Sequence, residues 1–511
     1  MKQKTAMRFW NTYWIILLLG LMQMAEAQTV SPRDFGWDDA TTDSARFWVL
    51  YNTHVAAIQS HSTVSYQGMD TLDIEIPSNA KSIPLGDSNH FADVVFRVKN
   101  THKNLFLFSR IRESKPIAVA DNDLLCQCIE NKDFSPIPEL SEGRYLLHIT
   151  DSNAWVGQRA NHAYGHYRED LTFITNGHGV DPTTAPYLSH NSQPRCKIVS
   201  YDMEEITFYF GHLTLIRDSL ASHRTYLLDI QYLVSPIISH VSVYTPASML
   251  VDDCIMRIYH CYMPNFYNIH IQGSYSRTNR SGYGILMNNC FYSQFNHLYA
   301  RTPWGVFGTN NMNNVVFSFC DFDRFDIHCY GRDIFFYNCR QQDSYNQYSS
   351  TFGIISHENC HFDNFTPVLI ESSYNAYNHF ELWVENCTWH LTPERNYLMD
   401  AGPQVRATPI RQELEPYCLP SVRISNSTIT TDKKVREMHL FHFRGQPVQQ
   451  PIQATSYIDL DNISCPKKLK IELTQRKYKD ISFQEDIQFN LLRTDLKNTI
   501  IEKNIVPLQN Y

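Results

Sequence analysis

One short stretch carries more side chains able to do chemistry than its neighbours do. Residues 321–333 read DFDRFDIHCYGRD, with four aspartates, two arginines, one histidine and one tyrosine. If the apolar residues of this stretch point into a core, strand alternation puts Asp326, His328 and Tyr330 together on the outer face. The pattern therefore predicts a site with acid, base and phenol groups on one exposed strand.

The preceding coil offers a matching set. With Leu298 pointing inward, His297, Tyr299 and Arg301 point outward. We expect this strand to lie beside the first, so that both polar sets share one face. The alternative is a chance polar face or an ion-pair ladder between Asp326, Arg301 and Arg332.

A glycoside hydrolase is one chemistry that these residues could perform. It needs two carboxylates, with Asp326 and either Glu371 or Asp323 as the candidates. Separations of about 5 Å or about 6.5–9.5 Å would indicate retaining or inverting hydrolysis.

A polysaccharide lyase is the other chemistry, and the sequence does not choose between the two. His328, His297 or Tyr330 would act as the base, while Arg301 or Arg332 would neutralise a uronate carboxylate. No cofactor is predicted, although a lyase could use Ca²⁺. No Cys/His spacing resembles a zinc site, so no metal ligands are predicted.

Insertions near this stretch predict a groove. Surplus residues leave the coils at 277–283, 301–311 and 372–378, and at least two insertions begin at a similar distance from the preceding repeat cysteine. Loops stacked on one corner would wall a groove, although tolerated surface loops are the alternative. The substrate-binding candidates in these insertions are Arg277, Arg280, Trp304 and Tyr374.

The charge distribution indicates the type of ligand. Residues 257–340 contain seven arginines, no lysine and four aspartates, in a chain of formal net charge −8. Guanidinium groups pair bidentately with carboxylates, so we expect an acidic, uronate-containing polysaccharide or oligosaccharide. Nucleic acid is not expected, because a nucleic-acid-binding chain is usually basic.

A repeated phrase predicts the elements that position these residues. A short alternating apolar strand, then usually Asn and Cys, returns around Cys290, Cys320, Cys339, Cys360 and Cys387. Repeats of about 20–50 residues indicate a solenoid. Because the unit contains strands and turns but no helical pattern, the predicted fold is all-β, a right-handed parallel β-helix. The five cysteines are predicted to form one ladder of buried thiols, because stacked strands lie about 4.8 Å apart.

The start of the chain predicts export. Lys2, Lys4 and Arg8 precede the apolar run 14–22, and residues 25–27 read Ala-Glu-Ala, a small-residue cleavage site. The apolar run is too short for a membrane span, and Gln28 would begin the mature chain, so no lipid anchor is expected. We therefore predict a secreted or periplasmic protein without a membrane span. Nothing in the sequence indicates its oligomeric state.

The predicted organisation has five parts. An amphipathic helix near the start of the mature chain would cap the open end of the solenoid. The parts are a signal peptide (1–27), the cap and first strands (28–112), loop-rich early coils with room for a small subdomain (113–200), the regular β-helix (201–466) and a closing segment (467–511).

The export signal, helical cap and Asn-punctuated coils resemble the pectate-lyase-like superfamily of right-handed parallel β-helices. That resemblance implies a polysaccharide lyase, a glycoside hydrolase or a tailspike depolymerase. It is architectural, and it gives no site residues. Gly177-His178-Gly179 matches one polygalacturonase motif without its companions. Arg301-Thr-Pro303 begins a pectate-lyase motif, but Val306 stands where the second arginine belongs.

Two functions therefore remain open from the sequence. The first is an exported carbohydrate-active enzyme that cleaves an acidic polysaccharide. The second is a non-catalytic glycan-binding or cell-surface β-helix, favoured by the failure of both subfamily motifs.

Overall fold

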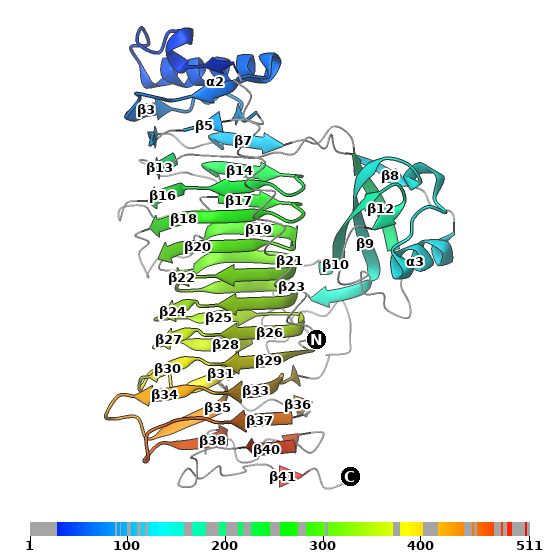
Figure 1. The fold of residues 1–511 in the computed structure, drawn as a ribbon, viewed down its shortest axis with the longest axis vertical. Helices are drawn as coiled ribbons and strands as arrows, with labels where there is room; N and C mark the ends of the chain where they lie inside the picture. Colours follow the sequence, from blue (N-terminus) through cyan, green and yellow to red (C-terminus); the bar gives the residue numbers. More distant parts are fainter. Residues whose placement is uncertain are drawn as a thin grey trace.

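A computed structural model places most of the chain. It describes residues 28–86, 89–91, 93–99, 104–109, 114–117, 121–157, 166–179, 194–200, 213–217, 226–245, 256–273, 283–301, 305–370, 379–401, 417–443, 452–453, 457–474, 482–483, 488–492 and 506–507. These residues form a right-handed parallel β-helix with a helical cap at one end and a small domain at its side (Figure 1).

The solenoid is one continuous ladder of parallel strands. Its 29 described strands pair with the strand one coil above and one coil below. The middle of the solenoid is built from β17 (Met256–Tyr259), β18 (Asn265–Gly273), β19 (Tyr283–Phe291), β20 (Gln294–Arg301), β21 (Gly305–Ser318), β22 (Asp321–Phe322), β23 (Phe325–Tyr337), β24 (Arg340–Gln342), β25 (Tyr345–Tyr348), β26 (Thr351–Glu358), β27 (His361–Asp363), β28 (Thr366–Ile370), β29 (His379–Glu385), β30 (Thr388–Leu391) and β31 (Tyr397–Ala401).

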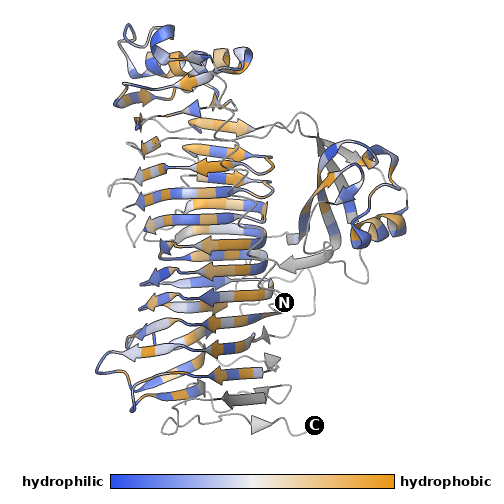
Figure 2. Cartoon of the chain, viewed as in Figure 1, coloured by the Kyte–Doolittle hydropathy of each residue, from blue (hydrophilic) through white to orange (hydrophobic). Residues whose placement is uncertain are grey.

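Aromatic side chains stack through the interior in register with the strands. Phe266, Phe295, Phe317, Phe336 and His357 form a column, with ring centroids 4.5–5.0 Å apart and interplanar angles of 4–11°. All five are buried, and orange strand residues alternate with blue ones along the solenoid (Figure 2). The spacing matches that of paired strands, so identical positions in successive coils meet face to face.

The corners of the coils require left-handed backbone. One corner column contains Asn338, Asn359, Asn386, Asn426 and Asn462, with φ between 49° and 54°. Asn is enriched in this conformation, which other non-glycine residues adopt less readily. The Asn that precedes Cys339, Cys360 and Cys387 is thus explained by the turn.

The repeat cysteines form two ladders rather than the single predicted one. Cys320, Cys339, Cys360 and Cys387 follow one another at one corner, where each sulfhydryl donates to a backbone carbonyl. Cys290 instead stacks on Cys261 at a different corner and lies in register with Met312. The free thiols include all the cysteines of these two ladders, and burial raises the pKa of Cys290 and Cys339.

The helical cap covers the open end as predicted. Helix α2 (Asp43–Ser60) begins after Thr42, whose side chain accepts a hydrogen bond from the Ala45 N–H at 3.1 Å. Its residues Phe47 and Leu50 are buried against the first coils, which include β3 (Thr71–Glu75), β6 (Val95–Lys99) and β7 (Phe106–Ser109). The cap removes the unpaired end of the core from water.

The segment predicted to be loop-rich early coils contains an antiparallel sheet set apart from the solenoid (Figure 1). Its elements are β8 (Ser114–Ile117), α3 (Asn122–Asn131), β9 (Arg144–Gly157), β10 (His166–Thr175), β11 (His178–Gly179) and β12 (Pro194–Ser200). Its described contacts with the solenoid include a cluster of Leu146, Leu171, Phe173, Tyr262 and Phe291. The solenoid then resumes at β13 (Leu213–Arg217), which pairs with β6.

The far end continues the same ladder through β33 (Ser421–Ser425), β34 (Thr428–Thr431), β35 (Glu437–Phe443), β37 (Tyr457–Asp461), β38 (Lys470–Thr474) and β40 (Gln488–Leu492). A separate parallel sheet at this end contains β32 (Tyr417–Cys418), β36 (Ile452–Gln453), β39 (Ser482–Phe483) and β41 (Val506–Pro507). Within the described part of the chain, no helix has the length and apolar character needed to cross a membrane.

Candidate functional site

The candidate site lies where β19, β21 and β23 begin, at one corner of the solenoid. Phe325 and Ile327 of β23 pack in the core, so Asp326 between them points to the opposite face. Its register neighbours are Gly308 in the coil before and Gln347 in the coil after. Asp326 is nevertheless fully buried, which the sequence did not predict.

A backbone irregularity directs the next side chain. The register between β21 and β23 shifts at Thr309, leaving His328 as the extra residue of a bulge. Bulges locally reorient a side chain and are frequent near functional sites. His328 is thereby brought beside Asp326, with 18% of its side chain exposed.

Four side chains form what we call the Tyr283 cluster, which consists of Tyr283, Arg324, Asp326 and His328. The Tyr283 hydroxyl donates to Asp326 Oδ2 at 2.8 Å and lies 2.7 Å from His328 Nε2. Arg324 Nε donates to Asp326 Oδ1 at 2.7 Å, and its second nitrogen lies 2.6 Å from Oδ2. The carboxylate thus receives both a bidentate guanidinium and a phenol.

Gly308 makes room for this arrangement. A Cβ at Gly308 would lie 2.5 Å from Cδ2 of Tyr283, a distance that real Cβ atoms do not show. The tyrosine ring therefore lies across the bare backbone of one coil to reach Asp326 in the next. Glycine is required here for a close approach rather than for its backbone angles.

The ion pair is held in a covered position. Burial alone would lower the pKa of Arg324, but the Asp326 carboxylate and the Tyr345 ring beside it outweigh that effect and raise the pKa above its usual range. The Arg324 guanidinium carbon lies 4.5 Å from the Tyr345 ring centroid. Arg324 therefore stays charged, and it compensates the Asp326 charge.

The hydrogen bonds define how protons can be placed in the cluster. Because the phenol O–H donates to Asp326, its oxygen can accept a hydrogen bond from His328 Nε2–H. Neutral His328 would then have Nδ1 as its acceptor nitrogen. The cluster can therefore offer an imidazole base beside a phenol acid.

The same outer face continues along the solenoid with further polar groups. Leu369, Asp400 and His442 follow Gln347 in register, and His442 Nδ1 lies 3.0 Å from Asp400 Oδ1. Tyr397 stacks on the His442 ring at 4.4 Å. Three strand steps of about 4.8 Å separate Asp326 from Asp400, or roughly 14 Å, too far for a hydrolytic carboxylate pair.

The two strands predicted to share one face do not. The first set, His297, Tyr299 and Arg301, lies on β20, which pairs with β18, β21 and β22. The part of β23 that contains Asp326 pairs instead with the start of β21 and with β25. A corner at residues 323–324 separates the two sets. The prediction overlooked this corner because strand alternation does not show where a coil turns.

Two of the predicted residues lie where left-handed backbone interrupts their strands. His297 and Tyr330 both have φ of 55°, and such a backbone interrupts strand alternation. His297 is exposed and stacks on Phe319, whereas Tyr330 is buried near Phe352. Asp323 lies at the corner between β22 and β23 and is partly buried.

The arginines predicted to bind an acidic ligand have partners already. Among the described arginines of residues 257–340, each pairs with an aspartate: Arg257 with Asp229, Arg301 with Asp321, Arg324 with Asp326, Arg332 with Asp333 and Arg340 with Asp363. The excess of positive charge read from the sequence is thus largely compensated by aspartates in the fold.

The remaining predicted site residues, Arg277, Arg280, Trp304, Glu371 and Tyr374, lie outside the described residues. The strand ends on either side of 274–282 and 302–304 lie in register, at the corner before β19 and β21. Residues 371–378 instead follow β28 and precede β29, at another corner. The first two insertions therefore share a corner, whereas the spacing from the repeat cysteines had paired the second with the third.

Sequence reasoning missed Tyr283 and Arg324 as members of the site. Tyr283 was counted as the last residue of an insertion, although it is the first residue of β19. The available signal was Gly308, since a glycine within a strand pattern indicates that something approaches closely. Arg324 had been included only in a count of arginines.

No family model matches the sequence, and no curated protein matches it either. Among solved structures, the chain is similar to the tailspike gp49 of Pseudomonas phage LKA1, with 12% identity over 87% of this chain and 82% of that one, at a TM-score of 0.48. It is also similar to the gp61 tailspike of Pseudomonas phage phi297, with 12% identity over 87% of this chain and 81% of that one, at a TM-score of 0.45.

A third similar structure is the gp54 tailspike of Acinetobacter baumannii bacteriophage AP22 in complex with a capsular saccharide, at 10% identity over 94% of this chain and 76% of that one, with a TM-score of 0.40. These likenesses are too distant to support an argument about site or function.

Proposed function

We propose that this protein is an exported carbohydrate-active enzyme of the pectate-lyase-like superfamily that cleaves an acidic polysaccharide at the Tyr283 cluster. The observation that carries the proposal is the Tyr283 hydroxyl placed within hydrogen-bond distance of both Asp326 and His328. A buried carboxylate, a phenol and a partly exposed imidazole joined in this order are suited to moving a proton.

The geometry favours a lyase over a hydrolase. Asp326 is paired on both oxygens, with Arg324 and Tyr283 bound to the carboxylate and His328 beside it. A hydrolase needs a second carboxylate within about 5–9.5 Å, and Asp400 is roughly 14 Å away by strand steps. Of the two carboxylates predicted for that role, Glu371 lies outside the described residues and Asp323 lies at the corner between β22 and β23, outside the Tyr283 cluster. The phenol and imidazole are the acid and base that elimination requires.

The elimination would proceed as follows. His328 Nδ1 takes the proton from C5 of a uronate, a C4=C5 double bond forms, and the C4–O4 bond breaks. The departing O4 receives the Tyr283 hydroxyl proton, and His328 Nε2–H returns a proton to the phenolate through their hydrogen bond. Arg324 and Asp326 keep the phenol in position for this proton transfer.

A digestion panel of uronate-containing and neutral polysaccharides tests this proposal. The wild type should release products with the ultraviolet absorbance of an unsaturated uronate. Tyr283→Phe and His328→Gln should lower kcat by about 10²–10⁴, the usual contribution of acid–base groups. Tyr299→Phe and His361→Gln, both exposed and outside the cluster, should leave kcat unchanged.

Three results would contradict the proposal. New reducing ends without unsaturated product would indicate a hydrolase. Binding without turnover, measured by affinity electrophoresis across the panel, would indicate the glycan-binding alternative. Turnover of a neutral glycan alone would refute the acidic substrate.

A further inference from the structure

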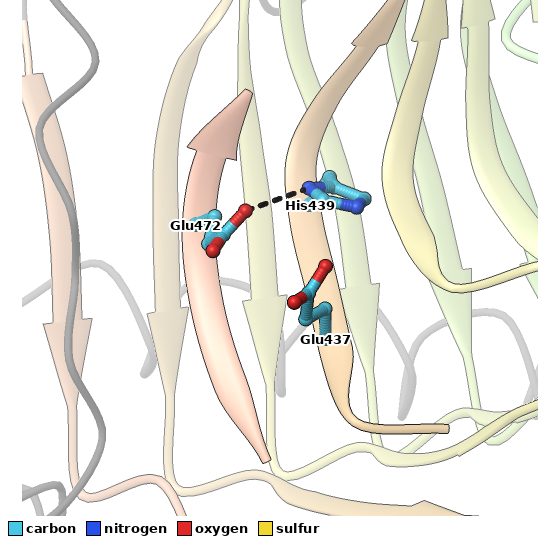
Figure 3. A group of neighbouring side chains, drawn as sticks. All are labelled: Glu437, His439 and Glu472. Atoms are coloured by element: carbon cyan, nitrogen blue, oxygen red, sulfur yellow. Dashed lines mark ion pairs between the residues drawn. The ribbon is translucent and has the colours of Figure 1, made fainter. Parts of the chain in front are cut away.

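A second group of side chains able to bind a ligand lies on the same outer face, further along the solenoid. Glu437 and His439 come from β35 and Glu472 comes from β38, and Figure 3 shows their polar ends directed toward one another. Met438 and Ile471 are in the core, so strand alternation turns all three ligand-type residues away from it. Register places His439 directly opposite Glu472.

The three residues have the geometry of a metal site. One ligand atom from each lies within 4.8 Å of the others, and His439 Nδ1 lies 3.7 Å from Glu472 Oε2. Zinc bound at about 2.0–2.2 Å from each ligand separates neighbouring ligand atoms by roughly 3.3–3.5 Å. Side-chain movements of about 1 Å would therefore bring the three ligand atoms to bonding distance from one ion.

Burial gives a reason for a cation here. The Glu472 side chain is 0% exposed and that of His439 is 10% exposed. An ionised carboxylate removed from water needs a compensating charge. A divalent ion bound between the strands would compensate both carboxylates together.

We propose that Glu437, His439 and Glu472 form a site for a divalent cation of the zinc type. One imidazole nitrogen and two carboxylates leave a fourth tetrahedral position for water or another ligand. Calcium and magnesium prefer all-oxygen sites, so the histidine favours zinc or a similar transition metal. From β23 to β35 there are four strand steps, or roughly 19 Å, so this site is separate from the Tyr283 cluster.

The ion would join β35 to β38 near the last coils of the solenoid. An unfolded chain has no preformed site, so metal binding adds directly to folding stability. The expected consequence is a melting temperature that rises with the logarithm of free zinc concentration. This readout does not depend on any enzymatic activity.

The test uses the full mature protein after dialysis against a chelator. Titration calorimetry with Zn²⁺ should give one site per chain, and Ca²⁺ and Mg²⁺ should bind at least tenfold more weakly. Glu472→Gln and His439→Gln should each weaken Zn²⁺ binding by tenfold or more. Glu385→Gln, an exposed position on β29, is the matched control and should bind as the wild type does.

Co²⁺ substitution distinguishes this site from the many thiols of the chain. The proposed ligands give a cobalt spectrum without the intense near-ultraviolet band of thiolate coordination. A thiolate band, an absence of Zn²⁺ binding, or equal binding by Glu472→Gln and the wild type would each overturn the proposal. If Glu472→Gln fails to fold, His439→Gln decides the outcome alone.

Discussion

Two neighbouring parts of the solenoid surface hold their charges in different ways. In the Tyr283 cluster, the side chain of Asp326 is 0% exposed and that of Arg324 is 7% exposed. Tyr283 donates a hydrogen bond to Asp326, and the Tyr345 ring lies against Arg324. On the β20–β22 face, Arg301 and Asp321 form a pair whose side chains are 20% and 32% exposed. Both contain one Asp and one Arg, so residue type alone does not distinguish them. What differs is whether water can replace a lost partner.

The largest difference should appear on neutralising the aspartates. Asp326→Asn leaves the Arg324 charge buried and without its counter-ion, which should cost about 3–5 kcal/mol of unfolding free energy. Asp321→Asn should cost about 0–1 kcal/mol, because solvent replaces the partner. Denaturant midpoints of both variants measure this contrast. Equal midpoints would show that the two pairs do not differ as described.

Removing the phenol hydroxyl tests the cluster at a second point. Tyr283→Phe loses a hydrogen bond to a charged carboxylate, so we expect a loss of about 1.5–3 kcal/mol. Tyr299→Phe, with 42% of the residue exposed, should change stability by less than about 0.5 kcal/mol. Thermal melting of both variants gives the comparison. A Tyr283→Phe variant as stable as the wild type would mean that this hydrogen bond is not formed.

The space above Gly308 gives a third, smaller effect. Gly308→Ala places a Cβ against the Tyr283 ring and should cost about 1–3 kcal/mol through local overpacking. The same substitution in a Tyr283→Ala background should cost much less, because the contact has gone. An equal cost in both backgrounds would show that the glycine has another role.

The smallest effect is expected from the partly exposed pair, Arg301 and Asp321. Arg301→Gln should lower stability by at most about 1 kcal/mol, and added salt should remove the difference, because exposed charges are screened within about 3 Å at 1 M. The Asp326→Asn loss should persist at the same salt concentration. The measurement is the unfolding midpoint of each variant with and without 1 M NaCl. Salt sensitivity in Asp326→Asn alone would reverse the comparison.

The sequence predicted the architecture well because the fold repeats. The same strand and turn sequence recurs in each coil. The Asn column and the Cys320–Cys387 ladder could therefore be predicted from the periodicity of the sequence. The assignment of Cys290 to that ladder was wrong because a coil has several corners, and similar phrases occur at two of them. Periodicity shows that a repeated phrase forms a corner of the coil, but it does not show which of the several corners that phrase forms.

The site was predicted only in part, for a physical reason. Alternation between Phe325 and Ile327 turns Asp326 away from the core, but the predicted exposure of Asp326 was wrong and the direction of His328 is set by a bulge. The burial of Asp326 depends on Tyr283, which precedes Asp326 by 43 residues and reaches it across another coil. The proposed cation site includes His439 and Glu472, which are 33 positions apart in the chain. No local sequence motif could therefore indicate it.

The side domain has a consequence for how the chain folds. It lies between β7 and β13 in the sequence. Val95 of β6 therefore pairs with Thr214 of β13, which is 119 residues further along the chain. In the middle coils, by contrast, Asp326 meets Gln347 after only 21 residues. The longer closure costs roughly 1.5 kcal/mol more chain entropy. Contacts between nearby residues form fastest, so the middle coils should assemble first and the capped end should join an existing solenoid.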